Sequence, residues 1–188
     1  ITPSTIRISF VKGVTGTIQD TNWKAQADTA VTWGAKESRS EVQLLTDRIL
    51  IRVEKANGAV QFLSRDGKKL LAENPSEPRL LLDSQTWNFF AWDKNERLKS
   101  KGVLADDFMD LSTKARYISF GQKKLRMPLV LSNKGYAIGV AAGSAVLFCN
   151  VRIYGQYIYT QGTGQIDYYF IYDENQERNI EQYRNLPV

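Results

Sequence analysis

Three aspartates are the residues of this sequence best suited to acid–base chemistry. Asp106, Asp107 and Asp110 stand together in the segment DDFMD. A pair of carboxylates hydrolyses glycosidic bonds when the two groups lie about 5–5.5 Å apart (retaining) or about 6.5–9.5 Å apart (inverting). Nothing beside these aspartates in the sequence would raise one pKa above the other. The segment is therefore compatible with a solvated loop, with the rim of a sugar-binding site, or with a self-contained hydrolytic site.

Three tyrosines form a second candidate site. Tyr154, Tyr157 and Tyr159 occur in the segment YGQYIYTQG. Tyrosines on a sheet stack on sugar rings while their hydroxyls bond to sugar oxygens. They also favour strands for purely structural reasons. The pattern leaves two interpretations open: packing in a core or domain interface, and stacking against an oligosaccharide.

The sequence contains no histidine and only one cysteine, Cys149. Without histidine, Ser-His-Asp and Cys-His catalysis and histidine-based metal sites are excluded. A single cysteine also excludes a thiolate zinc site. Because Cys149 lies in the apolar run AVLFCNV, we expect a buried, unreactive thiol. No cofactor and no metal site are predicted.

Length and composition favour one globular domain over residues 1–188. The hydrophobic content is 43%, and no apolar run approaches the ~18 residues of a membrane span. The net charge of +5 is spread among acidic residues, without the basic patch and interleaved aromatics that nucleic-acid binding requires. We predict neither a nucleic-acid partner nor a membrane span. The first residue is Ile1 rather than Met, which predicts a processed chain or a piece of a longer one.

Short extended segments separated by turn signals predict an all-β, antiparallel β-sandwich. Asn57-Gly58 and Asp66-Gly67 each lie between extended runs and favour tight hairpins, because both residue types tolerate positive φ. The stretch 133–135, Asn-Lys-Gly, predicts a further turn.

The last part of the sequence predicts a strand followed by a short C-terminal helix. In IDYYFIY, alternation places Tyr168 and Phe170 on one face and Tyr169 and Ile171 on the other. Both faces are apolar, so we expect a partner layer on each. The helix is expected over 173–186, with Asp173 as its N-cap.

Three ordered blocks of the sequence resemble a known family. These blocks are EVQLLTDRILIRVEKANGAVQFLSRDGKKLL (41–71), RMPLVLSNKGYAIGV (126–140), and GQIDYYFIY (164–172) followed by a helix ending in YRNL. Together they resemble the N-terminal domain of glycoside hydrolase family 31, which includes α-glucosidases and α-xylosidases. The resemblance covers most of the chain.

The resemblance implies a galactose-mutarotase-like β-sandwich that precedes a (β/α)8 catalytic barrel. In the family the barrel carries both catalytic carboxylates, so no catalytic residue is assigned within 1–188. The helix over 173–186 would lead toward the barrel, and the barrel would cover part of the preceding strand. The implied partners are that barrel and an α-linked oligosaccharide. A free-standing carbohydrate-binding module and an unrelated interaction domain are the alternatives.

Overall fold

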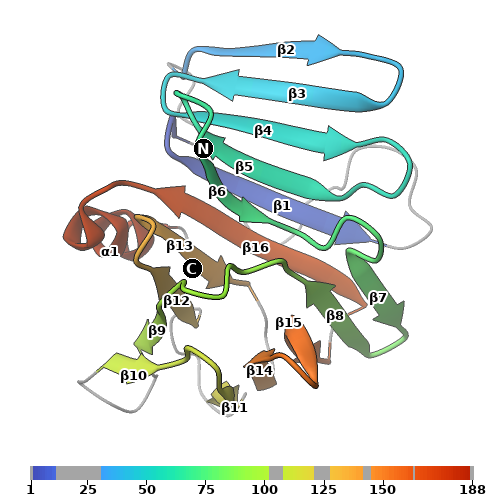
Figure 1. Cartoon of the computed structure of the whole chain (residues 1–188), viewed down its shortest axis with the longest axis vertical. Helices are drawn as coiled ribbons and strands as arrows, with labels where there is room; N and C mark the ends of the chain where they lie inside the picture. The colour runs from blue at the N-terminus through green and yellow to red at the C-terminus, as the bar shows by residue number, and fades with distance from the viewer. Residues whose placement is uncertain are drawn as a thin grey trace.

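The computed structural model describes residues 2–11, 31–101, 108–120, 128–141, 145–162 and 164–186. Within these residues the chain forms three antiparallel sheets and one helix, which confirms the predicted all-β fold with a short C-terminal helix (Figure 1).

Sheet A has six strands in the order β1-β16-β13-β12-β9-β10. They are β1 (Thr5–Val11), β9 (Leu98–Lys101), β10 (Phe108–Asp110), β12 (Leu129–Ser132), β13 (Tyr136–Val140) and β16 (Gln165–Tyr172). The first and last strands of the chain, β1 and β16, pair along their whole length. Sheet A therefore holds the two ends of the described chain together.

Sheets B and C have five strands each. Sheet B runs in the order β2 (Trp33–Glu37), β3 (Glu41–Thr46), β4 (Ile49–Glu54), β5 (Val60–Ser64) and β6 (Lys69–Ala72). Sheet C runs in the order β11 (Ala115–Phe120), β14 (Ala145–Val151), β15 (Gly155–Gln161), β8 (Gln85–Phe89) and β7 (Arg79–Leu82). The two sheets adjoin where an isolated bridge pairs Glu73 with Phe90.

The predicted turns are confirmed. Gly58, Gly67 and Gly135 have φ values of 72°, 86° and 86°, a region that L-residues with a Cβ rarely occupy. The first two glycines join β4 to β5 and β5 to β6, and Gly135 joins β12 to β13. Sheet B is thus a meander whose register is set by its hairpin turns.

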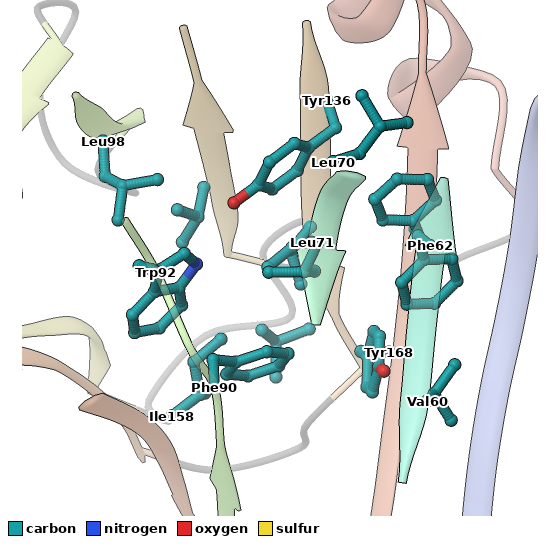
Figure 2. Close-up of a cluster of buried hydrophobic side chains, with 14 of the residues drawn as sticks. Val60, Phe62, Leu70, Leu71, Phe90, Trp92, Leu98, Tyr136, Ile158 and Tyr168 are labelled. Atoms are coloured by element: carbon teal, nitrogen blue, oxygen red, sulfur yellow. The ribbon is translucent and has the colours of Figure 1, made fainter. Parts of the chain in front are cut away.

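One hydrophobic core joins all three sheets (Figure 2). Sheets B and A meet where the rings of Phe62 and Phe170 stack with centroids 3.9 Å apart. Near sheet C, the Phe90 ring lies edge-on to Tyr168 of β16, with centroids 5.8 Å apart. Sheet A therefore forms one layer of the sandwich, and sheets B and C together form the other.

A second, smaller cluster lies on the outer face of sheet A. There the helix α1 (Gln176–Arg184) places Tyr183 against β13 and β16, and Leu186 packs in the same cluster. Tyr169 and Ile171 are fully buried beneath this cluster. The chain's own helix therefore supplies the partner layer that was expected on this face of β16, and cover by a barrel stays a prediction.

The helix begins later than the sequence pattern predicts. Its N-cap is Asn175, whose side chain accepts a hydrogen bond from the Glu177 backbone N–H. The predicted N-cap, Asp173, instead accepts a hydrogen bond from the Asn175 backbone N–H at 2.9 Å. The prediction of Asp173 was wrong because two capping-type residues stand close together, and the first forms a turn that leads into the second.

Replacing Gly135 with alanine is expected to destabilise the chain by about 1–3 kcal/mol. Besides adopting positive φ, the new Cβ would lie 3.1 Å from both the Asp173 carbonyl oxygen and the Glu174 Cα. Gly67→Ala is the matched control, because Gly67 has the same φ of 86° but no atom within 4 Å of its Cβ position. Urea denaturation should rank Gly135→Ala as the costlier change; equal costs would contradict the close approach at Gly135.

Candidate functional site

Asp110 is the last residue of β10, the edge strand of sheet A, and lies on the same outer face of that sheet as the helix α1. It borders a groove of about 340 Å³, which is lined by Arg97, Leu98, Lys99, Phe108, Asp110, Asn133 and Gln176. Asp106 and Asp107, the other two predicted candidates, lie outside the described residues. The side chain of Asp110 is exposed, and its carboxylate accepts a hydrogen bond from the Ser112 backbone N–H at 3.0 Å.

The electrostatics of this groove suit binding better than acid catalysis. Hydrogen bonds from the backbone and side chain of Ser112 lower the pKa of Asp110. An ionised carboxylate accepts hydrogen bonds but cannot donate a proton to a leaving group. Asp110 is also the only carboxylate among the described residues that line the groove. The described residues of the groove therefore do not supply the pair of carboxyl groups that glycoside hydrolysis requires.

The remaining lining residues offer an apolar surface next to hydrogen-bonding groups. Phe108 is 42% exposed, and the Lys99 Nζ lies 4.4 Å from its ring centroid. The Gln176 amide donates to the Ser132 carbonyl, and the Asn133 side chain accepts from the Arg97 backbone N–H. Both amides retain further hydrogen-bonding capacity. The groove thus combines a partly exposed aromatic ring with amide and charged groups.

The three candidate tyrosines lie elsewhere, on sheet C. Tyr157 and Tyr159 are half-buried on the outer face of β15, beside Phe89 and Trp87 respectively. Tyr154 lies in the turn between β14 and β15 and is 68% exposed. The tyrosines and Asp110 are therefore on opposite outer faces of the sandwich, and the structure does not combine them into one site.

Two of the buried carboxylates, Glu73 and Glu96, organise networks that the sequence analysis did not single out. Glu73, which is 2% exposed, accepts hydrogen bonds from the Val60 backbone N–H at 2.9 Å and the Tyr168 hydroxyl at 3.0 Å, and it forms an ion pair with Arg79. Arg79 in turn donates to the Gly58 carbonyl at 2.8 Å. This Glu73 network ties β5, β7 and β16 together. Its only sequence signal is an acid directly after the buried run LLA.

Glu96 organises a second network, at 5% exposure. Its carboxylate accepts hydrogen bonds from the Ser132 hydroxyl at 2.6 Å and from the Tyr136 hydroxyl. Lys134 lies 3.1 Å from Glu96 and also pairs with Asp93. Since both Glu73 and Glu96 are closed off from solvent by their partners, their role is to hold strands and turns together rather than to meet a substrate.

The stability of the chain is expected to fall steeply as pH rises above about 10. Burial and the adjacent carboxylates raise the pKa of Tyr136 and Tyr168 well above 10.0. Burial alone would lower the pKa of Lys134, but Asp93 and Glu96 outweigh it and raise that pKa above 10.5. The folded chain thus keeps protons that the unfolded chain releases, at a cost of up to about 1.4 kcal/mol per pH unit per group.

Urea midpoints measured across the ordinary tyrosine pKa of about 10, from about pH 9 to about pH 11.5, check this alkaline loss. Tyr168→Phe should flatten the pH slope by up to one proton relative to the wild-type chain. An identical slope in the wild-type and Tyr168→Phe chains would contradict the assignment.

The described residues present neither a metal-binding cluster nor a membrane-crossing helix. No three of their histidine, cysteine, aspartate and glutamate side chains are grouped to hold a metal ion. Cys149 is buried and unpaired, as predicted. None of the helical structure described in this chain is long and apolar enough to span a bilayer.

The fold is an antiparallel β-sandwich that also occurs within carbohydrate-active enzymes. Similar solved structures include a GH31 dextranase of Flavobacterium johnsoniae complexed with isomaltotriose (17% identity, TM-score 0.78). They also include a GH31 α-xylosidase from a soil metagenome complexed with xylose (18%, 0.72) and a cycloalternan-forming enzyme from Listeria monocytogenes in complex with a pentasaccharide substrate (15%, 0.75). No family model matches the chain, and no curated protein is significantly similar to it in sequence.

The matches cover almost all of this chain but only a small part of each matched enzyme. They cover 99%, 98% and 97% of this chain but only 24%, 31% and 19% of the dextranase, the xylosidase and the cycloalternan-forming enzyme. The chain therefore has the fold of one part of these glycoside hydrolases and spans less than a third of their length. At such low identities the likeness establishes this fold, which is the fold that the family resemblance predicted.

Proposed function

We propose that this chain is the non-catalytic N-terminal domain of a glycoside hydrolase family 31 α-glycosidase and that it supports a (β/α)8 catalytic barrel. The unequal coverage of the structural matches is the observation that carries this proposal. Nearly all of this chain corresponds to at most 31% of each of the three enzymes. A barrel of roughly 250 residues would account for much of the remainder.

The chemistry of the described residues supports a non-catalytic role. Asp110 stands alone as a carboxylate in its groove, and Glu73 and Glu96 are sealed by their own partners. The retaining mechanism needs a nucleophilic carboxylate and a separate acid/base. Under this proposal both groups belong to the barrel.

Two of the three sequence blocks of the resemblance also occupy connected places in the fold. The block 126–140 contributes β12, the Gly135 turn and β13, and the last block contributes β16 and α1. The Gly135 carbonyl accepts hydrogen bonds from the Asp173 backbone N–H and the Asn179 amide, both at 3.0 Å. The turn thus anchors the end of β16 and the start of α1.

The first test is the mass of the native polypeptide, determined by blotting source-cell lysate with an antibody raised against this domain. A band larger than 21.4 kDa by at least one barrel, roughly 250 residues, would support the proposal. A band at 21.4 kDa would refute it and favour a free-standing carbohydrate-binding module.

The groove beside Asp110 favours a second candidate function, which is binding of an α-linked oligosaccharide by the domain itself. Calorimetric titration of the chain with maltotriose and isomaltotriose tests it. Loss of binding in Phe108→Ala, with Tyr157→Ala unchanged, would assign the sugar to the groove; the reverse would assign it to sheet C. No binding at millimolar sugar would rule out both sites.

A further inference from the structure

The outer face of sheet C carries an unbroken apolar row that crosses all five strands. Cross-strand pairing places one residue of each strand in this row: Leu80, Trp87, Tyr159, Leu147 and Tyr117. In an antiparallel sheet, directly paired residues lie on the same face. The row therefore forms one continuous surface, which we call the outer row.

A second apolar row runs beside the first. Phe89 pairs with Tyr157, and Tyr157 pairs with Cys149. The Phe89 and Tyr157 rings lie 5.9 Å apart between centroids. Two adjacent rows thus place apolar residues on the outer face of sheet C, where a solvated face would carry mainly polar residues.

The exposed large hydrophobic side chains of the described residues concentrate on this sheet. Five of the eight belong to sheet C or to its β14–β15 turn: Leu80, Leu82, Tyr117, Ile153 and Tyr154. Their exposed fractions are 40%, 50%, 46%, 80% and 68% respectively. Exposed apolar surface gathered into one patch marks an interaction site, whereas single exposed residues do not.

Two other apolar faces of the described sandwich are covered. The inner face of sheet C packs in the main core through residues such as Phe148 and Ile158. The outer face of sheet A is covered by Tyr183 of α1 and by Leu186. The residues of the outer row belong to neither of these buried clusters, so no described element covers the outer face of sheet C in the same way.

The arrangement of the rings favours a protein partner over a sugar. The Trp87 and Tyr159 rings are inclined at 48°, and the Phe89 and Tyr157 rings at 72°. A flat platform for sugar rings needs aromatic faces that lie side by side in one plane. The inclined rings, with Leu80 and Leu147 on either side of the Trp87–Tyr159 pair, offer ridges and hollows for interdigitating side chains.

We infer that the outer face of sheet C is the surface on which another domain of the same polypeptide packs. This inference rests on the proposed function, and it assigns the contact to one named face. In the enzymes that share the fold, at least 69% of the chain lies outside the matched part, since the matches cover 19–31%. Chains of that length contain further domains, and an apolar surface of one of them would pack on the outer face of sheet C.

Hydroxyl-radical footprinting of the native full-length polypeptide tests this inference, with the 188-residue chain as the reference. Tyr117 and Leu80 should be labelled severalfold less in the full-length protein than in the reference chain. Trp33 on β2, which is 66% exposed, is the control and should be labelled equally in both. The double variant Leu80→Lys/Tyr117→Lys should separate a single thermal unfolding transition of the full-length protein into two.

The outcomes distinguish this inference from the proposed function. A larger polypeptide whose Tyr117 is labelled as in the reference chain would overturn the inference and leave the proposed function intact. A native polypeptide of 188 residues would overturn both. Protection of Tyr117 in the reference chain by isomaltotriose, or by raising its own concentration, would overturn the inference in favour of a glycan or of a second copy.

Discussion

Replacing Arg79 with methionine is expected to destabilise the folded chain by about 3–5 kcal/mol. The change removes the cation paired with Glu73, a carboxylate that is only 2% exposed. It also removes the donor to the Gly58 carbonyl. Glu73 must then take up a proton or remain as an unpaired buried charge, and both are unfavourable. Urea denaturation at pH 7 measures the loss.

Two companion variants separate the charge effect from the loss of packing. Glu73→Gln combined with Arg79→Met should recover part of the stability, because no charge is then left unpaired. Arg48→Met removes a half-exposed ion pair with Asp173 and should cost less than about 1 kcal/mol. If Arg79→Met cost no more than Arg48→Met, the Glu73 network would contribute no more than a surface pair.

Replacing Phe170 with alanine is expected to destabilise the chain by a similar amount, about 3–5 kcal/mol. Phe170 is fully buried on β16, between β1 and β13 in sheet A. Its ring stacks on Phe62 at 3.9 Å and lies 5.5 Å from the Tyr136 ring. The substitution would open a cavity where sheet A meets sheet B.

Phe170→Leu should cost less than Phe170→Ala, because leucine fills part of the cavity. Ile153→Ala, at a side chain that is 80% exposed, should change the free energy of unfolding by no more than about 0.5 kcal/mol. Thermal and urea denaturation should show the largest loss of stability for Phe170→Ala, a smaller loss for Phe170→Leu and the smallest for Ile153→Ala. An equal cost for Phe170→Ala and Ile153→Ala would contradict the assignment of Phe170 to the core.

Most of what the sequence predicted correctly depends on residues close together in the chain. The Gly58 and Gly67 hairpins follow from glycines that tolerate positive φ next to Asn and Asp. The two faces of β16 follow from simple alternation, and Tyr168 and Tyr169 do lie in different clusters. Even the local rules failed where signals competed, as at Asp173, which precedes the true N-cap.

The candidate site was only partly predictable. Asp110 does line a groove, but its neighbours Arg97, Asn133 and Gln176 come from different loops and from the helix. Their proximity depends on how β9, β12 and α1 pack, which no short sequence pattern encodes. The sequence does not distinguish packing from sugar stacking for the three tyrosines. The inclination of the Tyr157 and Tyr159 rings to their aromatic neighbours, which only the structure shows, favours a protein interface.

By itself, the sequence of this protein determined the all-β class, the turns and the absence of histidine chemistry, since these depend on composition or on neighbouring residues. Only the tertiary structure decided which charges are buried and which faces are covered. Arg7 and Asp167, 160 residues apart, form an ion pair at 2.6 Å because β1 pairs with β16. Likewise, α1 covers sheet A and leaves sheet C open, because burial depends on which surfaces meet after the strands have paired.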